Sequence, residues 1–217
     1  RPFPNAVQWQ GKYIGRFGKK AAVYSLLQQT ANAYNQDMGI TSVFETRDTY
    51  SGLDIDPEVS TQTVNNVVFY LQTLKAPIQR DKNDSDVKAG SILFANIGCA
   101  KCHTPSFSTG YSSIAALSNK IVFPYSDLLL HDMGAGLDDG YTEGSAFTSE
   151  LRTPPLWGIG LSRNSQGGHF FLLHDGRAKS IEEAILLHGG EAAKAKLIYQ
   201  LLKTDERRKL VKFLESL

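Results

Sequence analysis

The chain has 217 residues, 41% of them hydrophobic, enough to bury a core in one large domain or two small ones. Its 23 lysines and arginines nearly balance 22 acidic residues, so bulk charge gives no support to binding of nucleic acid or a membrane surface. No apolar run approaches the roughly 18 residues of a spanning helix, and we expect a soluble protein without a membrane span.

Residues 1–80 predict an N-terminal helical segment. A basic and aromatic opening over 9–20 precedes a helix-like stretch over 21–36, which stops near Gly39. A second helix is predicted over 60–75, because Pro77 lies just beyond its end and apolar side chains follow one side. These side chains are Val64, Val67, Val68 and Leu71. The polar residues 79–85 predict a linker. We place the boundary within it, so that the second segment covers residues 81–217.

A helix over 86–97 leads into the run Cys99-Ala-Lys-Cys102-His103, the attachment signature of a c-type haem. Thiols at this spacing can bond to the two vinyl groups of one porphyrin, and the next histidine becomes the proximal iron ligand. The alternatives are a redox dithiol and half of a zinc site. A dithiol motif should follow a strand, and a zinc site needs further ligands, yet the chain has only 2 cysteines. We therefore predict one covalent haem c.

Two helices are expected to cross beside this motif. Gly90 and Phe94 lie one turn apart, which leaves a flat spot where another helix can approach and rest on the aromatic ring. The expected partner is the terminal helix, with Thr204 as its cap. Its apolar stripe consists of Leu210, Phe213, Leu214 and Leu217. Such a crossing predicts a cytochrome c core.

Residues 104–168 are rich in Gly, Ser, Pro and Asp and predict long loops with at most small strands, wrapped around the haem. Ser180 and Glu183 then form a capping box that opens a helix to about His188, where two glycines end it. Another helix is expected over 191–203. The predicted fold is mainly α, a cytochrome c-like haem domain with long loops and an N-terminal helical extension.

The sixth iron ligand is not fixed by spacing. Met133 lies in a Gly-flanked loop, and thioether ligation would raise the reduction potential. For His174 we favour a loop histidine bonded to Asp175 or to backbone over a direct haem role. The other candidates are His131, His169 and His188.

Several segments together carry a family resemblance. They are Gly15-Arg-Phe-Gly-Lys-Lys-Ala21, Asp37-Met-Gly-Ile-Thr-Ser42, the haem motif, Asp127-Leu-Leu-Leu-His-Asp-Met-Gly134, Arg152-Thr-Pro-Pro-Leu-Trp-Gly-Ile-Gly160, His174-Asp-Gly-Arg177 and Glu183-Ala-Ile-Leu-Leu-His-Gly-Gly-Glu191. The chain resembles the C-terminal, electron-transfer half of the bacterial di-haem cytochrome c peroxidase superfamily, and most closely the di-haem oxidoreductases, also labelled thiol oxidoreductases.

Members of that family carry two haem motifs, whereas this chain carries one. The resemblance therefore implies an electron-transfer half, which becomes peroxidase-like only with a second haem domain or subunit, and whose other partner is a small redox protein. It assigns no catalytic residue to this chain. The alternatives are an enzyme that reacts with peroxide at this haem, with an open sixth position, and a stand-alone monohaem electron carrier.

The resemblance also implies site residues. It places the sixth ligand at His188, at the end of a short helix before glycine, with Met133 or an open site as alternatives. Arg152 is expected beside a haem propionate, with an exposed ion pair equally compatible. Trp157 is a candidate haem contact, although a buried core aromatic is the favoured interpretation. The acidic group Asp132, Asp138 and Asp139 is a candidate calcium site, for which a solvated loop face is favoured.

Two further expectations concern the surroundings of the protein. Arg16, Lys19 and Lys20, beside Tyr13 and Phe17, are expected to face the missing haem domain or a redox partner. Bacteria attach haem c outside the cytoplasmic membrane, which predicts a periplasmic or otherwise extracytoplasmic protein. The sequence begins at Arg1 without a signal peptide, so we expect the export signal to be missing from it.

Overall fold

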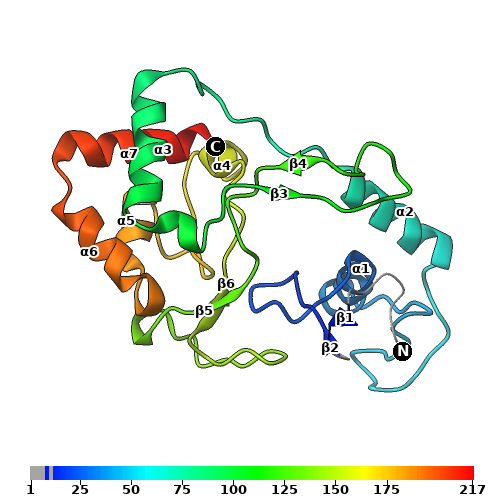
Figure 1. Ribbon diagram of the computed structural model, residues 1–217. Coiled ribbons are helices and arrows are strands. Elements are labelled where there is room, and N and C mark those ends of the chain that lie inside the picture. Colours follow the sequence, from blue (N-terminus) through cyan, green and yellow to red (C-terminus); the bar gives the residue numbers. More distant parts are fainter. Residues whose placement is uncertain (1–7, 10–11) are drawn as a thin grey trace. The chain divides into compact units, whose positions relative to one another are not determined.

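The computed structural model describes residues 8–9 and 12–217, so Arg1 and most of the opening before Lys12 lie outside the described residues. The chain divides into two compact units, Arg1–Lys75 and Ala76–Leu217 (Figure 1). The structure is mainly helical with small two-stranded sheets. This confirms the predicted mainly α fold class. In the described part of the chain, no helix combines the length and the apolar character needed to span a membrane.

The first unit begins with an antiparallel hairpin and contains two helical segments. Strands β1 (Gln8–Trp9) and β2 (Lys12–Tyr13) pair with Gln8 opposite Tyr13. Helix α1 (Leu26–Asn32) continues into a π-helical turn over Ala33–Asp37, and α2 covers Thr61–Thr73. The core of this unit consists of Val23, Leu27, Ala31 and Val64.

The first predicted helix begins later than expected. Ala21 has a φ of 54°, which a helix does not allow, and Val23 pairs with Phe17 in an isolated bridge. The helix starts only after Ser25, whose hydroxyl accepts a hydrogen bond from the Gln28 amide. Its predicted end near Gly39 is confirmed.

The prediction that Arg16, Lys19 and Lys20 form an exposed basic surface is wrong for Lys20. Arg16 and Lys19 are exposed, but Lys20 is buried, with 2% of its surface accessible. A lysine is rarely buried without a polar partner, so Lys20 does not belong to an exposed basic surface.

Helices α3 (Ser85–Asn96) and α7 (Thr204–Ser216) form the centre of the second unit. A Cβ on Gly90 would strike the Lys209 carbonyl oxygen and would lie 2.7 Å from Cβ of Phe213, so the crossing requires glycine at this point, as predicted. The Glu206 carboxylate accepts a hydrogen bond from the Lys203 amide. Thr204 is therefore the first helical residue and not the predicted cap.

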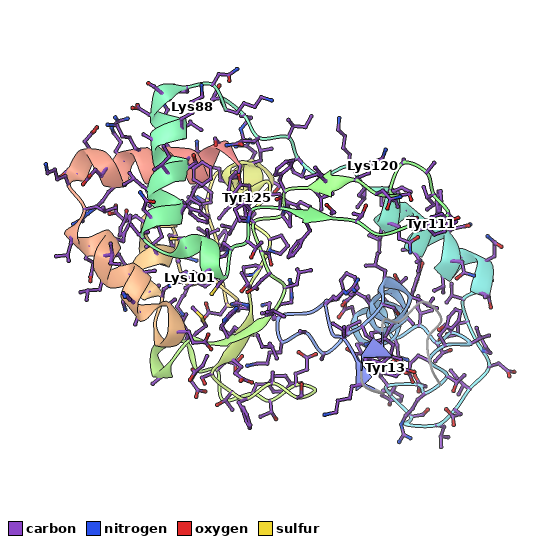
Figure 2. The ribbon with its side chains drawn as sticks, in the orientation of Figure 1. Tyr13, Lys88, Lys101, Tyr111, Lys120 and Tyr125 are labelled. Carbon is purple, nitrogen blue, oxygen red and sulfur yellow. The ribbon has the colours of Figure 1, made fainter. Side chains whose placement is uncertain are left out.

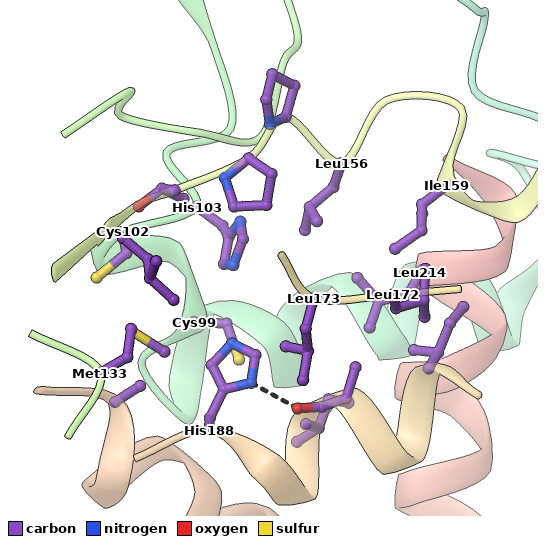
Figure 3. A pocket seen from close by; sticks show the side chains of 18 of the residues that line it. Cys99, Cys102, His103, Met133, Leu156, Ile159, Leu172, Leu173, His188 and Leu214 are labelled. Carbon is purple, nitrogen blue, oxygen red and sulfur yellow. Dashed lines mark hydrogen bonds between the residues drawn. The ribbon is translucent and has the colours of Figure 1, made fainter. Parts of the chain in front are cut away.

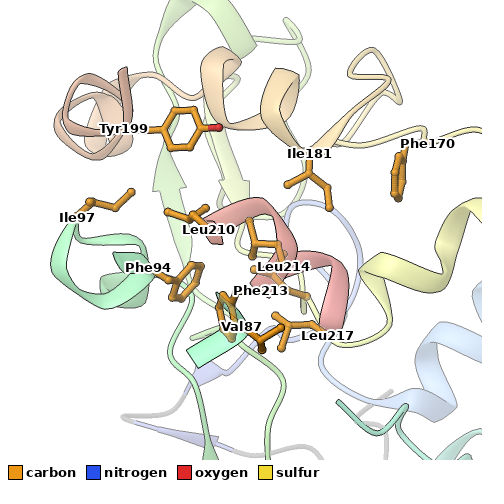
Figure 4. Close-up of a cluster of buried hydrophobic side chains, with 11 residues drawn as sticks. Val87, Phe94, Ile97, Phe170, Ile181, Tyr199, Leu210, Phe213, Leu214 and Leu217 are labelled. Carbon is orange, nitrogen blue, oxygen red and sulfur yellow. The ribbon is translucent and has the colours of Figure 1, made fainter. Parts of the chain in front are cut away.

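The predicted apolar stripe of α7 is buried in the main core (Figure 4). Phe94 of α3 and Phe213 of α7 pack edge to face with ring centroids 5.4 Å apart. Tyr125, labelled in Figure 2, follows the strands of the loop region and packs against both rings. This core therefore joins the α3–α7 crossing to the loops.

The loop region of the second unit contains small strands, as predicted. Strands β3 (Phe107–Ser108) and β4 (Ile121–Val122) pair antiparallel, as do β5 (Leu130–Asp132) and β6 (Glu150–Arg152). Helix α4 (Ile159–Ser165) was missed within this region, because its seven residues are too few to show an apolar period.

Helix α5 (Ile181–Leu187) ends at the candidate ligand His188, and α6 (Ala193–Leu201) begins shortly after it. Helix α5 starts at the predicted capping box, where the Ser180 hydroxyl accepts from the Glu183 amide. A 3₁₀ turn over Gly190–Ala192 leads into α6.

The predicted linker over 79–85 is bound to the second unit, because Gln79 and Arg80 donate hydrogen bonds to Ser216 at the end of α7.

Candidate functional site

A cavity of about 390 Å³ lies inside the second unit (Figure 3). Its volume falls within the range typical of ligand and cofactor sites. The structure brings all the sequence-predicted site residues to its wall: Cys99, Cys102, His103, Arg152, Trp157 and His188. Most of the remaining lining is aliphatic or aromatic, so the cavity suits a large, flat and mostly apolar group.

The cysteines and His103 share one tight turn after α3. Gly98 has a φ of 99°, which glycine adopts without strain, and it ends the helix. A 3₁₀ turn over Cys99–Lys101 follows, and the His103 amide donates to the Cys99 carbonyl at 2.9 Å. This local turn explains how both thiols and the imidazole reach the same cavity wall.

The imidazoles of His103 and His188 enter the cavity from opposite walls (Figure 3). Nδ1 of His103 lies 3.0 Å from the Tyr125 carbonyl, and Nδ1 of His188 lies 2.7 Å from the Ala184 carbonyl. A carbonyl can only accept, so Nδ1 carries the proton on each neutral ring. Nε2 is then left with its lone pair, the arrangement by which proteins orient a metal-ligating histidine.

Burial keeps both imidazoles neutral. It lowers the pKa of His103 from 6.5 to about 4, against the opposing effect of the Tyr125 hydrogen bond. Burial likewise lowers the pKa of His188, against the effect of the Ala184 hydrogen bond. A neutral imidazole is the form that binds a metal.

The two thiols are not activated for dithiol chemistry. Burial raises the pKa of Cys99 from 9.0 to about 11, and it also raises the pKa of Cys102. A redox-active or zinc-binding cysteine needs a stabilised thiolate, which this environment disfavours. The raised pKa values of the two thiols therefore disfavour a redox dithiol at these residues.

Met133 also lines the cavity and stays geometrically possible as a ligand. Its loop lies against the glycines after His188: a Cβ on Gly189 would lie 2.7 Å from the Met133 carbonyl oxygen. The structure therefore places the two alternative sixth ligands in adjacent segments.

Arg152 lies at the end of β6 on the cavity wall, half-buried. Burial lowers the pKa of its guanidinium, which remains a cation near neutral pH. His174 donates from Nε2 to the Arg152 carbonyl at 3.0 Å, which confirms the expected backbone bond of this histidine, although it too lines the cavity.

Trp157 is not the buried core aromatic that we favoured. It lines the cavity and is 38% exposed, because it follows a proline-rich turn just before α4. Its position fits the other interpretation, that of an aromatic at the rim of a cofactor site.

The pairing of His131 with two carboxylates is a feature that sequence reasoning missed. Its Nε2 lies 2.8 Å from the Asp127 carboxylate, and its Nδ1 lies 2.8 Å from the Glu191 carboxylate. Burial lowers the pKa of His131, but these two hydrogen bonds outweigh burial and the net shift is upward. The spacing of Asp127 and His131 was a visible signal, whereas Glu191 is remote in sequence.

The carboxylates of the candidate calcium site accept hydrogen bonds from backbone amides of their own loops. The Asp132 carboxylate accepts from the Gly134 amide, that of Asp138 from Gly140, and that of Asp139 from Tyr141. The cluster of metal-ligand side chains found among the described residues is Cys102, Asp127 and His131, which contains none of these aspartates.

These side chains fit a haem c. Two imidazole lone pairs face one apolar cavity, the two thiols lie on the turn that carries one of them, and a guanidinium on the wall suits a propionate.

One comparison with known proteins places the chain in a haem family. A family model described as "Di-haem oxidoreductase, putative peroxidase" matches residues 4–217. No curated protein sequence matches the chain. Among solved structures, Kuenenia stuttgartiensis hydrazine synthase pressurised with 20 bar xenon is similar, with 19% identity and a TM-score of 0.46. That match covers 79% of this chain and 60% of the hydrazine synthase chain.

Proposed function

The chain belongs to the di-haem oxidoreductase family and therefore has a haem-linked redox role, and from this premise we propose that it holds one covalent haem c and relays electrons. His103 is the proximal ligand and His188 the distal ligand. Cys99 and Cys102 carry the thioether bonds. The relay serves a peroxidase-like reaction that takes place at a second haem.

One observation carries the proposal. His103 and His188 stand on opposite walls of one cavity, each with Nδ1 bonded to a backbone carbonyl, so both present Nε2 to the same space. A carbonyl partner fixes both the tautomer and the ring orientation. Two preset ligands suit electron transfer, because they leave the metal closed to other ligands and change little between oxidation states.

The chain's own residues set the properties of the site. When bound, haem supplies an iron that alternates between ferric and ferrous. His103 and His188 would ligate the iron, and two imidazoles would give a lower potential than a His/Met pair. Leu156, Leu172 and Leu214 exclude water from the cavity wall. Arg152 binds a propionate and offsets its negative charge.

The partners follow from the same family membership. The family is described as di-haem, and this chain has a single CxxCH motif. We infer that a second haem domain or subunit completes the enzyme and that a small redox protein supplies electrons. Covalent attachment implies an extracytoplasmic, periplasmic location.

The test is an absorption spectrum of the chain produced in a host that matures cytochromes c, recorded oxidised and reduced. We expect a covalent, low-spin haem that shows no near-infrared thioether band. His188→Ala should give a high-spin ferric spectrum, and Met133→Leu, a volume-conserving control, should match the unmodified protein.

Each other outcome has a definite meaning. A thioether band that disappears in Met133→Leu would make Met133 the ligand. A high-spin spectrum in the unmodified protein would favour peroxide chemistry at this haem, and a colourless protein would reject haem binding altogether.

A further inference from the structure

His131 joins the two segments that carry the facing histidines. Its ring nitrogens each lie 2.8 Å from a carboxylate oxygen, of Asp127 on one side and of Glu191 on the other. Carboxylates at neutral pH only accept hydrogen bonds, so both ring nitrogens donate. His131 is therefore an imidazolium between two anions, and these charge-assisted bonds are stronger than neutral ones.

The Asp127 end is bound to the haem-attachment turn. The Asp127 amide donates to the Cys102 carbonyl at 2.8 Å, and the neighbouring Ser126 amide donates to the Thr104 carbonyl at 2.9 Å. Tyr125 accepts the hydrogen bond from His103 in the same stretch. Residues 125–127 thus follow the attachment turn along its length.

The Glu191 end is bound to the turn after His188. The other oxygen of Glu191 accepts from the Asp132 amide at 3.0 Å, so its carboxylate holds both His131 and the backbone of β5. Figure 1 shows β5 beside the start of α6, where this turn lies. Gly134 and Gly190 bring the two backbones together, since a Cβ on Gly134 would lie 2.8 Å from the Gly190 nitrogen.

We propose that His131, with Asp127 and Glu191, is a latch that fixes the separation of the His103 and His188 segments and thereby keeps His188 in place as a ligand. His131 is a positioning residue in this proposal, because it acts through the turn that follows His188. The ligand part rests on the proposed function; the coupling of the two segments does not. The Glu191 side chain is 55% accessible, so the bond between His131 and Glu191 is the one that we expect to break first.

The test compares His131→Phe and Glu191→Ala in the full, haem-loaded chain. Asp205→Ala is the matched control, because Asp205 pairs with Arg208 and Lys209 within α7. The readouts are the ferric spin state and carbon monoxide binding to the ferrous protein. We expect a high-spin fraction in both latch variants and carbon monoxide binding about tenfold tighter, the scale of one charge-assisted bond. Asp205→Ala should behave as the unmodified protein.

The double variant sharpens the result. If Glu191 acts through His131, adding Glu191→Ala to His131→Phe should change the spin state no further. The proposal would be overturned by latch variants that lose thermal stability but keep the haem of the unmodified protein. Such variants would remain fully low-spin and bind carbon monoxide as the unmodified protein does.

A measurement that does not read the haem spectrum separates the two proposals. Amide hydrogen exchange in the full, haem-loaded chain should rise in His131→Phe at both 131–134 and 188–192. If the unmodified protein is high-spin, the relay proposal fails. The exchange result then decides alone whether His131 couples the two segments. A rise confined to 131–134 would reject this coupling.

Discussion

His103 follows a tight turn at the end of a helix packed into the core, whereas His188 ends a seven-residue helix and is followed by two glycines. The turn of the first wall is built from neighbours in sequence, because Gly98, the 3₁₀ turn and the Cys99–His103 backbone bond all lie within one short segment. The Tyr125 carbonyl, more remote in sequence, then orients the His103 ring. The second wall depends on contacts from residues 127–134, far away in the sequence.

This difference shows which contacts fix the position of each histidine. A local motif can bring Cys99, Cys102 and His103 to one turn, although the Tyr125 carbonyl orients the imidazole. The distal ligand needs long-range contacts, so substitutions that alter those contacts should change ligation without touching attachment. The following predictions separate the two walls, beginning with the largest effect.

Gly90→Ala should be the most destabilising change. Its Cβ would strike the Lys209 carbonyl and lie 2.7 Å from Phe213 Cβ, so α7 must move away from the attachment wall. We expect a loss of about 3 kcal/mol in the free energy of unfolding, measured by chemical denaturation. Gly110→Ala, where the new Cβ meets nothing within 4 Å, should change it by less than about 0.5 kcal/mol. Equal effects would refute the close crossing.

Gly190→Ala tests the opposite wall. Gly190 has a φ of 49°, and its Cβ would strike the Asp132 carbonyl. We expect a loss of about 2 kcal/mol together with a ferric spin-state change. Gly140→Ala shares the left-handed backbone, with a φ of 68°, but has open space, so it should cost about 1 kcal/mol and leave the spectrum unchanged. An unchanged spectrum in Gly190→Ala would show that the turn does not position His188.

The sequence predicted the parts of this molecule that depend on local chemistry. The turn that carries Cys99, Cys102 and His103, the Ser180 capping box and the α7 stripe each follow from residues within one or two helical turns. The later start of α1 was not visible, because the positive φ of Ala21 and the bridge from Val23 to Phe17 are set by folding of that unit. The His131 pairing with Glu191 was invisible for the same reason. Trp157 was misjudged because exposure depends on what the turn packs against.

Ser180→Ala probes the helix that carries His188. The Ser180 hydroxyl accepts from the Glu183 amide at 3.0 Å, and loss of such a cap costs about 1 kcal/mol. We expect this loss in the free energy of unfolding, without loss of haem attachment. Ser91→Ala removes a serine that only donates to the Lys88 carbonyl within α3, and it should be close to neutral. If both variants behave alike, the cap does not stabilise α5.

The smallest effect should come from the ion pairs that join α3 to α7, on the attachment wall. Lys212 bonds to Asp84 at 2.8 Å and Arg208 bonds to Asp86 at 2.9 Å, and these bonds lower the pKa of both carboxyls below 3.8. A carboxyl with a lowered folded-state pKa stabilises the fold above its ordinary pKa and loses that contribution as pH falls through the lowered value.

Asp86→Asn should therefore lower the denaturation midpoint slightly at pH 7, and the difference from the unmodified protein should disappear as the pH falls through the lowered pKa of Asp86. Because these side chains are exposed, about 1 M salt should also reduce the difference. A difference that survives both acid and salt would mean that Asp86 stabilises the crossing through its shape and hydrogen bonds rather than its charge. The charge of Asp86 would then contribute nothing to the α3–α7 crossing, and the contribution of Asp86 should not depend on pH in this range.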